Sequence, residues 1–300
     1  MTVMSKSSSS ASSIYAKRPE RFLEIRVHLT GAQPASTRGL CTGYERGGWN
    51  NNGLADYMFE YLPDFALRYE ELGPVGHEMW VPKLVEAARS VYTTDKFKRR
   101  GEFGELLLHA VLREIWETEP AVSKIYYKDG PNVTVKGFDS VHVALAPGHS
   151  LELLLGEVKF YKAINRALTD VAKELRAHFE NDEWLRSEFI AVTRKIDSTW
   201  PHTVELKKLL HRRRTLASII KRVRVPVLLT YESSCVEMHD DCHEQYCADL
   251  TAEITEIQEQ FAGRALPTDV VIDLLLVPMH RKADLLGALE KRLRAWRLLA

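Results

Sequence analysis

Apolar residues recur along this chain with two different spacings, which predict helices in some segments and strands in others. Apolar positions three and four residues apart predict helices over residues 81–92, 103–117, 163–179, 183–196, 204–222, 242–261 and 282–299. Short runs that alternate or are continuously apolar predict strands at residues 22–29, 124–128, 133–145, 150–161, 223–232 and 269–279. The order of these segments indicates an α/β fold with a mixed central sheet flanked by helices.

Turn-forming and helix-breaking residues predict where these elements end. The glycine- and asparagine-rich segment 43–53 predicts a loop. Pro63 is expected to interrupt the aromatic helical stretch 54–67, because proline disrupts a helix interior. The turn signal "APGH" at 146–149 predicts that the strands on either side of it pair as a hairpin.

Composition suggests three parts of unequal size. Residues 1–14 are serine-rich and are expected to form a disordered tail. Residues 15–80 are expected to form an N-terminal extension that packs on the core or on a partner. Residues 81–300 then form the main domain.

The balance of charge limits the kinds of partner that the whole surface attracts. Among 300 residues, 45% are hydrophobic, and Lys+Arg and Asp+Glu both number 41. A folded globular chain without an overall positive field should contact nucleic acid only locally or through a partner. Four cysteines, no signal peptide and apolar runs far shorter than a membrane span favour a soluble, cytoplasmic protein.

Three charged residues interrupt the apolar hairpin. Glu157 and Lys159 lie two apart at the end of the strand 150–161, so both side chains should point to one face of the sheet. Asp139 belongs to the preceding strand, and the short turn lets the two strands lie side by side. Charges beside a buried strand are costly unless they are compensated. The pattern therefore predicts that the three groups converge.

Such a group has the chemistry of a phosphodiester hydrolase. Two carboxylates offer hard oxygen ligands for Mg²⁺, which takes one or two carboxylates together with waters and phosphate oxygens. A neighbouring lysine could orient or deprotonate a water, or stabilise charge on a phosphate. Glu105, on the predicted helix 103–117, borders the core and could complete the site, whereas Glu102 is expected to face solvent. The alternative is a surface salt bridge between Lys159 and a carboxylate.

The successive motifs "GEFGELLLHAVLRE", "KGFDSVHVAL" and "LELLLGEVKFYKAINRAL" resemble the PD-(D/E)xK nuclease superfamily. More narrowly they are similar to the nuclease subunits of the bacterial Hachiman anti-phage defence system, recognised by a G-E-x-G-E helix, a G-F-D hairpin and a G-E-x-K-F/Y strand. The likeness is close over residues 101–168. Phe138 stands where the superfamily often has proline.

The resemblance implies a PD-(D/E)xK nuclease-like core, with Asp139, Glu157 and Glu105 as metal ligands and Lys159 as the catalytic lysine. It implies a metal-dependent deoxyribonuclease that uses Mg²⁺, with Mn²⁺ as an alternative. It also implies a superfamily 2 helicase as partner in a heterodimer, which regulates cleavage of DNA. Two alternatives stay open: a catalytically idle module that docks and restrains the helicase, and a stand-alone restriction-type endonuclease.

Several basic residues are candidates for contacts with the DNA backbone. Arg and Lys bind phosphates without reading sequence. The candidates are Lys162, directly after the site, and two basic runs, whose members are Lys98, Arg99, Arg100, Arg212, Arg213 and Arg214. The runs are equally compatible with solvated helix faces.

Two further clusters have a structural interpretation. The segment 235–247 holds three cysteines and two histidines, but Cys235, Cys242 and Cys247 are spaced too widely for the tight pairs of a zinc site. The aromatic residues of the stretch 57–65 could stack on bases, although core packing is favoured. Trp184 and Trp200 are expected in the core as well.

Overall fold

The computed structural model describes residues 14–16, 19–73, 77–91, 100–123, 137–146 and 150–299. The strands are β1 (Glu24–Thr30), β2 (Ser36–Cys41), β3 (Tyr44–Glu45), β4 (Gly48–Trp49), β5 (Glu119–Pro120), β6 (Ser140–Ala146), β7 (Ser150–Phe160), β8 (Val223–Glu232) and β9 (Val271–Met279). The α-helices of the first half are α1 (Asn51–Glu60), α2 (Leu62–Ala66), α3 (Tyr69–Leu72), α4 (His77–Val91) and α5 (Arg100–Ile115). Those of the second half are α7 (Ile164–Phe179), α8 (Asp182–Lys195), α9 (Thr203–Leu209), α10 (Leu216–Ile220), α11 (Ser234–Met238), α12 (Glu244–Ala262) and α13 (Lys282–Leu298). A short 3-10 helix, η1, spans Ile14–Ala16.

Seven strands form one mixed sheet in the order β1-β2-β9-β8-β7-β6-β5. The central neighbours β2, β9, β8 and β7 run parallel, and antiparallel pairs close both edges. The strands β8 and β9 read as nearly continuous apolar runs because helices cover both of their faces. The predicted α/β fold with a mixed central sheet is confirmed.

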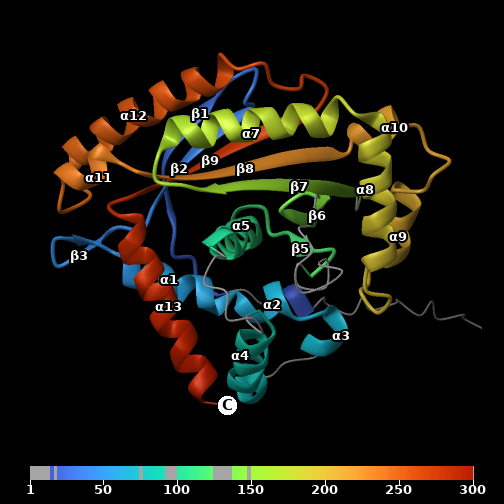
Figure 1. Ribbon diagram of the computed structural model, residues 1–300, viewed down its shortest axis with the longest axis horizontal. Coiled ribbons are helices and arrows are strands. Elements are labelled where there is room, and N and C mark those ends of the chain that lie inside the picture. Colours follow the sequence, from blue (N-terminus) through green and yellow to red (C-terminus); the bar gives the residue numbers. More distant parts are fainter. Residues whose placement is uncertain are drawn as a thin grey trace, which may run out of the picture.

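Two layers of helices enclose the sheet (Figure 1). Helices α7 and α12 lie over one face, while α5 lies against the other face with α1, α2, α4 and α13 beyond it. Helices α8, α9 and α10 gather at one end of the sheet. The hairpin of β6 and β7 is thus covered by α5 on one side and by α7 on the other.

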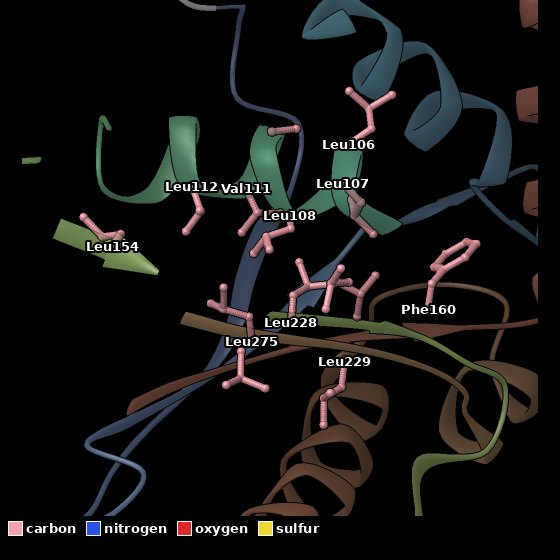
Figure 2. Packing of buried hydrophobic residues seen from close by; sticks show 14 of the residues in the cluster. Leu106, Leu107, Leu108, Val111, Leu112, Leu154, Phe160, Leu228, Leu229 and Leu275 are labelled. Atoms are coloured by element: carbon pink, nitrogen blue, oxygen red, sulfur yellow. The ribbon is translucent and has the colours of Figure 1, made fainter. Parts of the chain in front are cut away.

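The packing of α5 on β7 is close enough to require glycine. A side chain at Gly104 would meet Cβ of Phe160 at 2.8 Å, and one at Gly156 would meet Cδ2 of Leu108 at 2.9 Å. Figure 2 shows Leu108, Val111 and Leu112 of α5 pointing toward the sheet. Phe160 and the residues two and four before it therefore face α5, and the intervening side chains of β7 face α7.

A chain of buried polar side chains lies between α5 and β6. Asp64 accepts from Nε of Arg113 at 2.9 Å, and its other oxygen lies 3.0 Å from Nε2 of His109. Nδ1 of His109 is 3.1 Å from Nε2 of His142, whose Nδ1 is 2.8 Å from the hydroxyl of Thr118. We call these five residues the Asp64 network. All but Asp64 are almost fully buried.

The region 15–80 contributes to this architecture at two places. Strands β1 and β2 extend the central sheet beside β9, and α1 and α2 pack in the outer helical layer. The aromatic residues Tyr57, Phe59, Tyr61 and Phe65 are buried, as the core-packing interpretation predicts. Helix α2 begins just before Pro63, so the proline starts the second helix of the predicted broken pair.

Two sequence predictions of local structure are wrong, and one short helix was not predicted. Residues 43–53 are not a loop: β3 and β4 form a hairpin whose turn residues Arg46 and Gly47 both have positive φ, and α1 begins at Asn51. The predicted helix 204–222 is divided into α9 and α10, because Thr215 caps a new helix by accepting from the amide of Ser218. The short α11, capped by Ser233, is missing from the predicted elements.

The strand predicted at 133–145 begins only at Ser140, after a non-strand approach over Gly137–Asp139. The predicted strand 124–128 and the serine-rich residues 1–13 lie outside the described residues. None of the helices in the described part of the chain is both long enough and apolar enough to cross a membrane.

Candidate functional site

The candidate site lies where β6 separates from β7. The last paired residues of the hairpin at this end are Ser140 and Gly156. From Glu157 onward β7 still pairs with β8, but among the described residues β6 no longer pairs with it. Asp139, directly before β6, takes the place of a strand partner: its Oδ2 accepts from the backbone amide of Val158 at 3.0 Å. The separation of the two strands therefore places a carboxylate against β7 between Glu157 and Lys159.

Glu157 and Lys159 point to the α7 face of the sheet. Oε1 of Glu157 lies 3.1 Å from Nδ1 of His178, and the ammonium of Lys159 forms an ion pair with Glu174, both on α7. Only 2% of Glu157 and 8% of Lys159 is exposed. The structure therefore brings together Asp139, Glu157 and Lys159, which we call the β7 site.

Electrostatic coupling within the β7 site follows from this arrangement. Burial by itself lowers the pKa of Lys159, but the carboxylates of Asp139, Glu157 and Glu174 outweigh it and raise that pKa above its ordinary value. The side chain is therefore an ammonium at neutral pH. The pKa of His178 is lowered to about 4, chiefly by burial, with Lys159 acting in the same direction and Asp139 opposing. His178 is accordingly a neutral imidazole at neutral pH.

Aromatic side chains hold the approach to β6 in place. Phe138 is fully buried, and its ring packs edge-on against His178 at 5.0 Å and against Trp184 at 5.7 Å. The rings of His178 and Trp184 stack with centroids 4.1 Å apart and an interplanar angle of 6°. A large apolar residue at 138 thus fixes Asp139 at β7. Trp184 is half-buried where its ring contacts Phe138 and His178, whereas Trp200 lies in the core, as predicted.

The two glutamates of α5 approach from the other face of the sheet. Glu105 is half-buried on α5, which packs over Val158 and Phe160, opposite the side chains of Glu157 and Lys159. Its role as a third carboxylate stays a prediction. The expectation that Glu102 faces solvent is wrong, because only 7% of it is exposed where the first turns of α5 pack over the end of β7.

The predicted DNA contacts fall in different places. Lys162 is exposed just beyond β7, close in sequence to the β7 site. Arg212, Arg213 and Arg214 are exposed in the turn before α10. These arginines come before β8, which begins at Val223, and Glu157 pairs with Val227 of the same strand. The start of β8 is therefore about 13 Å from the level of Glu157, at 3.3 Å per residue.

The remaining predicted contacts cannot be placed. Lys98 and Arg99 lie outside the described residues, as does the side chain of Arg100.

The donor set of the β7 site fits a hard divalent cation. Asp139 and Glu157 supply carboxylate oxygens, and Mg²⁺ in proteins commonly uses one or two carboxylates and completes its shell with waters and phosphate oxygens. Within the part of the chain that the structure describes, no three His, Cys, Asp or Glu side chains are arranged to hold a metal ion. Two carboxylates are the protein ligands that the β7 site itself supplies.

The cysteine-rich segment 235–247 lies close to Cys41 in the structure. All four cysteines are free thiols. Sγ of Cys41 lies 3.6 Å from Sγ of Cys242, a proximity between distant segments that the sequence does not indicate. Burial raises the pKa of Cys235 and of Cys242 to about 12. These thiols are therefore weakly nucleophilic, as expected for structural cysteines.

Glu174 and His178 are site residues that sequence reasoning misses. Both lie on α7 and are four residues apart, so they share a helix face. The available signal is a match of spacings: two polar positions one helical turn apart follow two charged positions two apart on the preceding strand. That signal becomes specific only when the helix is known to cross this part of the strand.

Comparison with known proteins gives one family match. A search of curated proteins finds no relative that matches the chain. The family model described as HamA matches residues 18–293, which include the whole central sheet and the helices around it up to the last turns of α13. The chain therefore belongs to the HamA family, whose members are components of the Hachiman defence system.

Proposed function

We propose that the protein is a metal-dependent nuclease that hydrolyses DNA phosphodiester bonds as the effector subunit of the Hachiman system. The observation that carries the proposal is the hydrogen bond from the amide of Val158 to Asp139, which sets this carboxylate between Glu157 and Lys159. An acid and a base are nearly buried on one strand, beside a second acid from the diverging strand. Perturbed and coupled groups of this kind are typical of functional sites.

Asp139 and Glu157 are the residues that would hold Mg²⁺ or Mn²⁺. When bound, such an ion polarises the phosphodiester and makes a coordinated water more acidic. Lys159 is kept as an ammonium by the surrounding carboxylates. Its part is therefore to donate hydrogen bonds to phosphate oxygens and to stabilise negative charge in the transition state, not to remove a proton.

In this proposal the protein acts in the cytoplasm with a superfamily 2 helicase as partner. The formal net charge of the chain is +0, so long-range attraction to DNA is weak. A translocating partner that delivers DNA would supply what the surface charge does not. The exposed Lys162 would then contact the backbone next to the β7 site.

The test is cleavage of plasmid and linear DNA by the full chain, alone and with its helicase partner, with and without Mg²⁺. We expect metal-dependent cleavage that is lost in Asp139→Asn, Glu157→Gln and Lys159→Met. Glu152→Gln is the matched control, since Glu152 lies on β7 outside the β7 site.

Protection of cells against phage is the second measurement. Full protection by Glu157→Gln, with no cleavage by the wild type, would refute the nuclease and favour the idle docking module. Cleavage of bare DNA at defined sequences by the chain alone would favour a stand-alone endonuclease.

A further inference from the structure

Helix α7 faces the β7 site with two polar side chains that match it in spacing. Glu174 and His178 are one helical turn apart, about 6 Å along the axis at 1.5 Å per residue. Glu157 and Lys159 are two strand positions apart, about 6.6 Å. The equal spacing lets one face of α7 meet both residues of β7 at once: Glu174 contacts Lys159, and His178 contacts Glu157.

The two contacts restrain different kinds of freedom. Lys159 carries a long side chain, which loses substantial conformational entropy when it is fixed in one position. Glu174 holds its ammonium from the partly exposed side, with 43% of the glutamate side chain exposed. The Lys159 side chain itself is only 9% exposed, so this restraint acts on a nearly buried ammonium.

His178 is itself fixed by its neighbours. Its ring stacks on Trp184 and meets the edge of Phe138, so the nitrogen that faces Glu157 has a defined position. Phe138 also precedes Asp139 in the chain. The same aromatic contacts therefore set the relative position of both carboxylates.

We propose that Glu174 and His178 are positioning residues, which hold the Lys159 ammonium and the Glu157 carboxylate in the arrangement that binds metal and phosphate. The inference deepens the proposed nuclease function and rests on it. Neither residue is assigned to the reaction itself, since each acts through its partner on β7.

Metal binding tests the role of His178 without any cleavage. Binding of Mn²⁺ to the full chain is followed by the loss of the electron paramagnetic resonance signal of the free ion. We expect His178→Ala to raise the Kd for Mn²⁺ by roughly 10–100-fold, the usual cost of losing a group that orients a metal ligand. Wild-type affinity in this variant would overturn the role of His178.

Two conservative variants separate the nitrogen from the ring. His178→Asn keeps a nitrogen near the position of Nδ1, and we expect it to recover most of the lost affinity. His178→Phe keeps the stacking on Trp184, and we expect it to stay as weak as alanine. Recovery by phenylalanine but not by asparagine would show packing alone and would overturn the inference. Thermal melting of each variant confirms that the chain is folded.

Cleavage kinetics test the role of Glu174. We expect Glu174→Gln to lower kcat about tenfold, the size of one lost charge-assisted hydrogen bond, and to change KM for DNA less than about twofold. Glu180→Gln, exposed at the end of the same helix, is the matched control and should behave as wild type. A lower KM with a higher kcat would mean that Glu174 competes with the phosphate, which would overturn the positioning role.

The two readouts distinguish failure of the inference from failure of the proposed function. Mn²⁺ binding that depends on Glu157 and His178, without cleavage under any condition, would refute the nuclease and keep the role of His178. Cleavage that depends on Glu157, with wild-type metal binding and kinetics in the His178 and Glu174 variants, would keep the nuclease and refute this inference.

Discussion

The hairpin of β6 and β7 carries a cluster of charged and polar side chains on each of its faces, and the two clusters are built differently. On the α5 face, the Asp64 network is closed, and the side chain of Asp64 is only 13% exposed. On the α7 face, the β7 site concentrates two carboxylates and an ammonium at a place where the strands separate. Its partner Glu174 reaches solvent.

Hydrogen bonding explains the structural role of the Asp64 network, the closed cluster on the α5 face. Burial lowers the pKa of His142 well below its ordinary value, so its imidazole is neutral. The hydroxyl of Thr118 lies 2.8 Å from Nδ1 of His142, Nε2 of His142 lies 3.1 Å from Nδ1 of His109, and Nε2 of His109 lies 3.0 Å from Asp64. Each ring nitrogen thus has a polar partner within hydrogen-bonding distance, and Arg113 neutralises the carboxylate at the end of the chain. Such a fully connected network stabilises the fold and makes it rigid.

The largest expected effect on stability comes from opening the closed cluster. Asp64→Ala leaves Arg113 buried without its carboxylate, and breaking a buried pair in this way costs about 3–5 kcal/mol of unfolding free energy. Urea denaturation of the full chain measures the loss. A loss below about 1 kcal/mol would contradict the view that this cluster is structural.

The matched change on the other face should act on function instead of stability. Glu157→Gln should leave the free energy of unfolding within about 1 kcal/mol, because removal of a charge from a carboxylate-rich site relieves repulsion. Cleavage should fall at least about a hundredfold, since loss of a group that only orients a ligand already costs 10–100-fold. Urea denaturation and a cleavage assay on the same preparation check both parts. Retained cleavage would remove the distinction between the faces.

Acidic pH should weaken the fold through the closed cluster. The folded chain keeps His142 neutral, whereas the unfolded chain protonates this residue below about pH 6.5. The unfolded state then binds more protons than the folded state, so the free energy of unfolding decreases as the pH is lowered. Between pH 7 and pH 5 the loss from His142 reaches up to about 2 kcal/mol. His178 adds to it with the same sign, and the lowered pKa of Asp64 extends the loss below about pH 3.8.

Urea denaturation at pH 5, 6, 7 and 8 measures this dependence. His142→Asn should flatten the profile, because the asparagine side chain does not titrate. An equally steep profile in that variant would assign the effect to other groups.

The smallest expected effect concerns the aromatic wall between the two clusters. Phe138→Leu conserves most of the volume but removes the ring contacts with His178 and Trp184, and should cost about 1 kcal/mol of unfolding free energy. Because Asp139 directly follows Phe138, the substitution should also displace this carboxylate. The Kd for Mn²⁺ should therefore rise by more than the factor of about 5 that corresponds to 1 kcal/mol. Ile190→Leu, an exposed change on α8, serves as the control. Unchanged Mn²⁺ binding would show that position 138 does not set the carboxylate.

The β7 site could be anticipated because its signals are local. The separation of two charges on an apolar strand fixes their common face, and a turn signal fixes the pairing of β6 with β7. Glu174 and His178 could not be anticipated in the same way. Their contacts depend on the height at which α7 crosses β7, which is set by the connection at 161–163 and by packing on β8.

The closed cluster shows a second limit of sequence reasoning. His109 and His142 each interrupt an apolar run, which signals a buried polar group that needs a partner. The partner Asp64 lies in a separate aromatic segment 45 residues before His109. Nothing in either segment indicates the other, because the pairing arises from the packing of α2 on α5.

The parallel pairing of β2 with β9 has a consequence for how the chain is made. Ser36 and Asp273, which are neighbours in the sheet, are separated by 237 residues. At a translation rate of 5–20 residues per second, roughly 10–50 s pass between the synthesis of these two strands. The edge of β2 that pairs with β9 therefore stays without its partner strand on the ribosome until β9 has been synthesised, and the central sheet is completed only then.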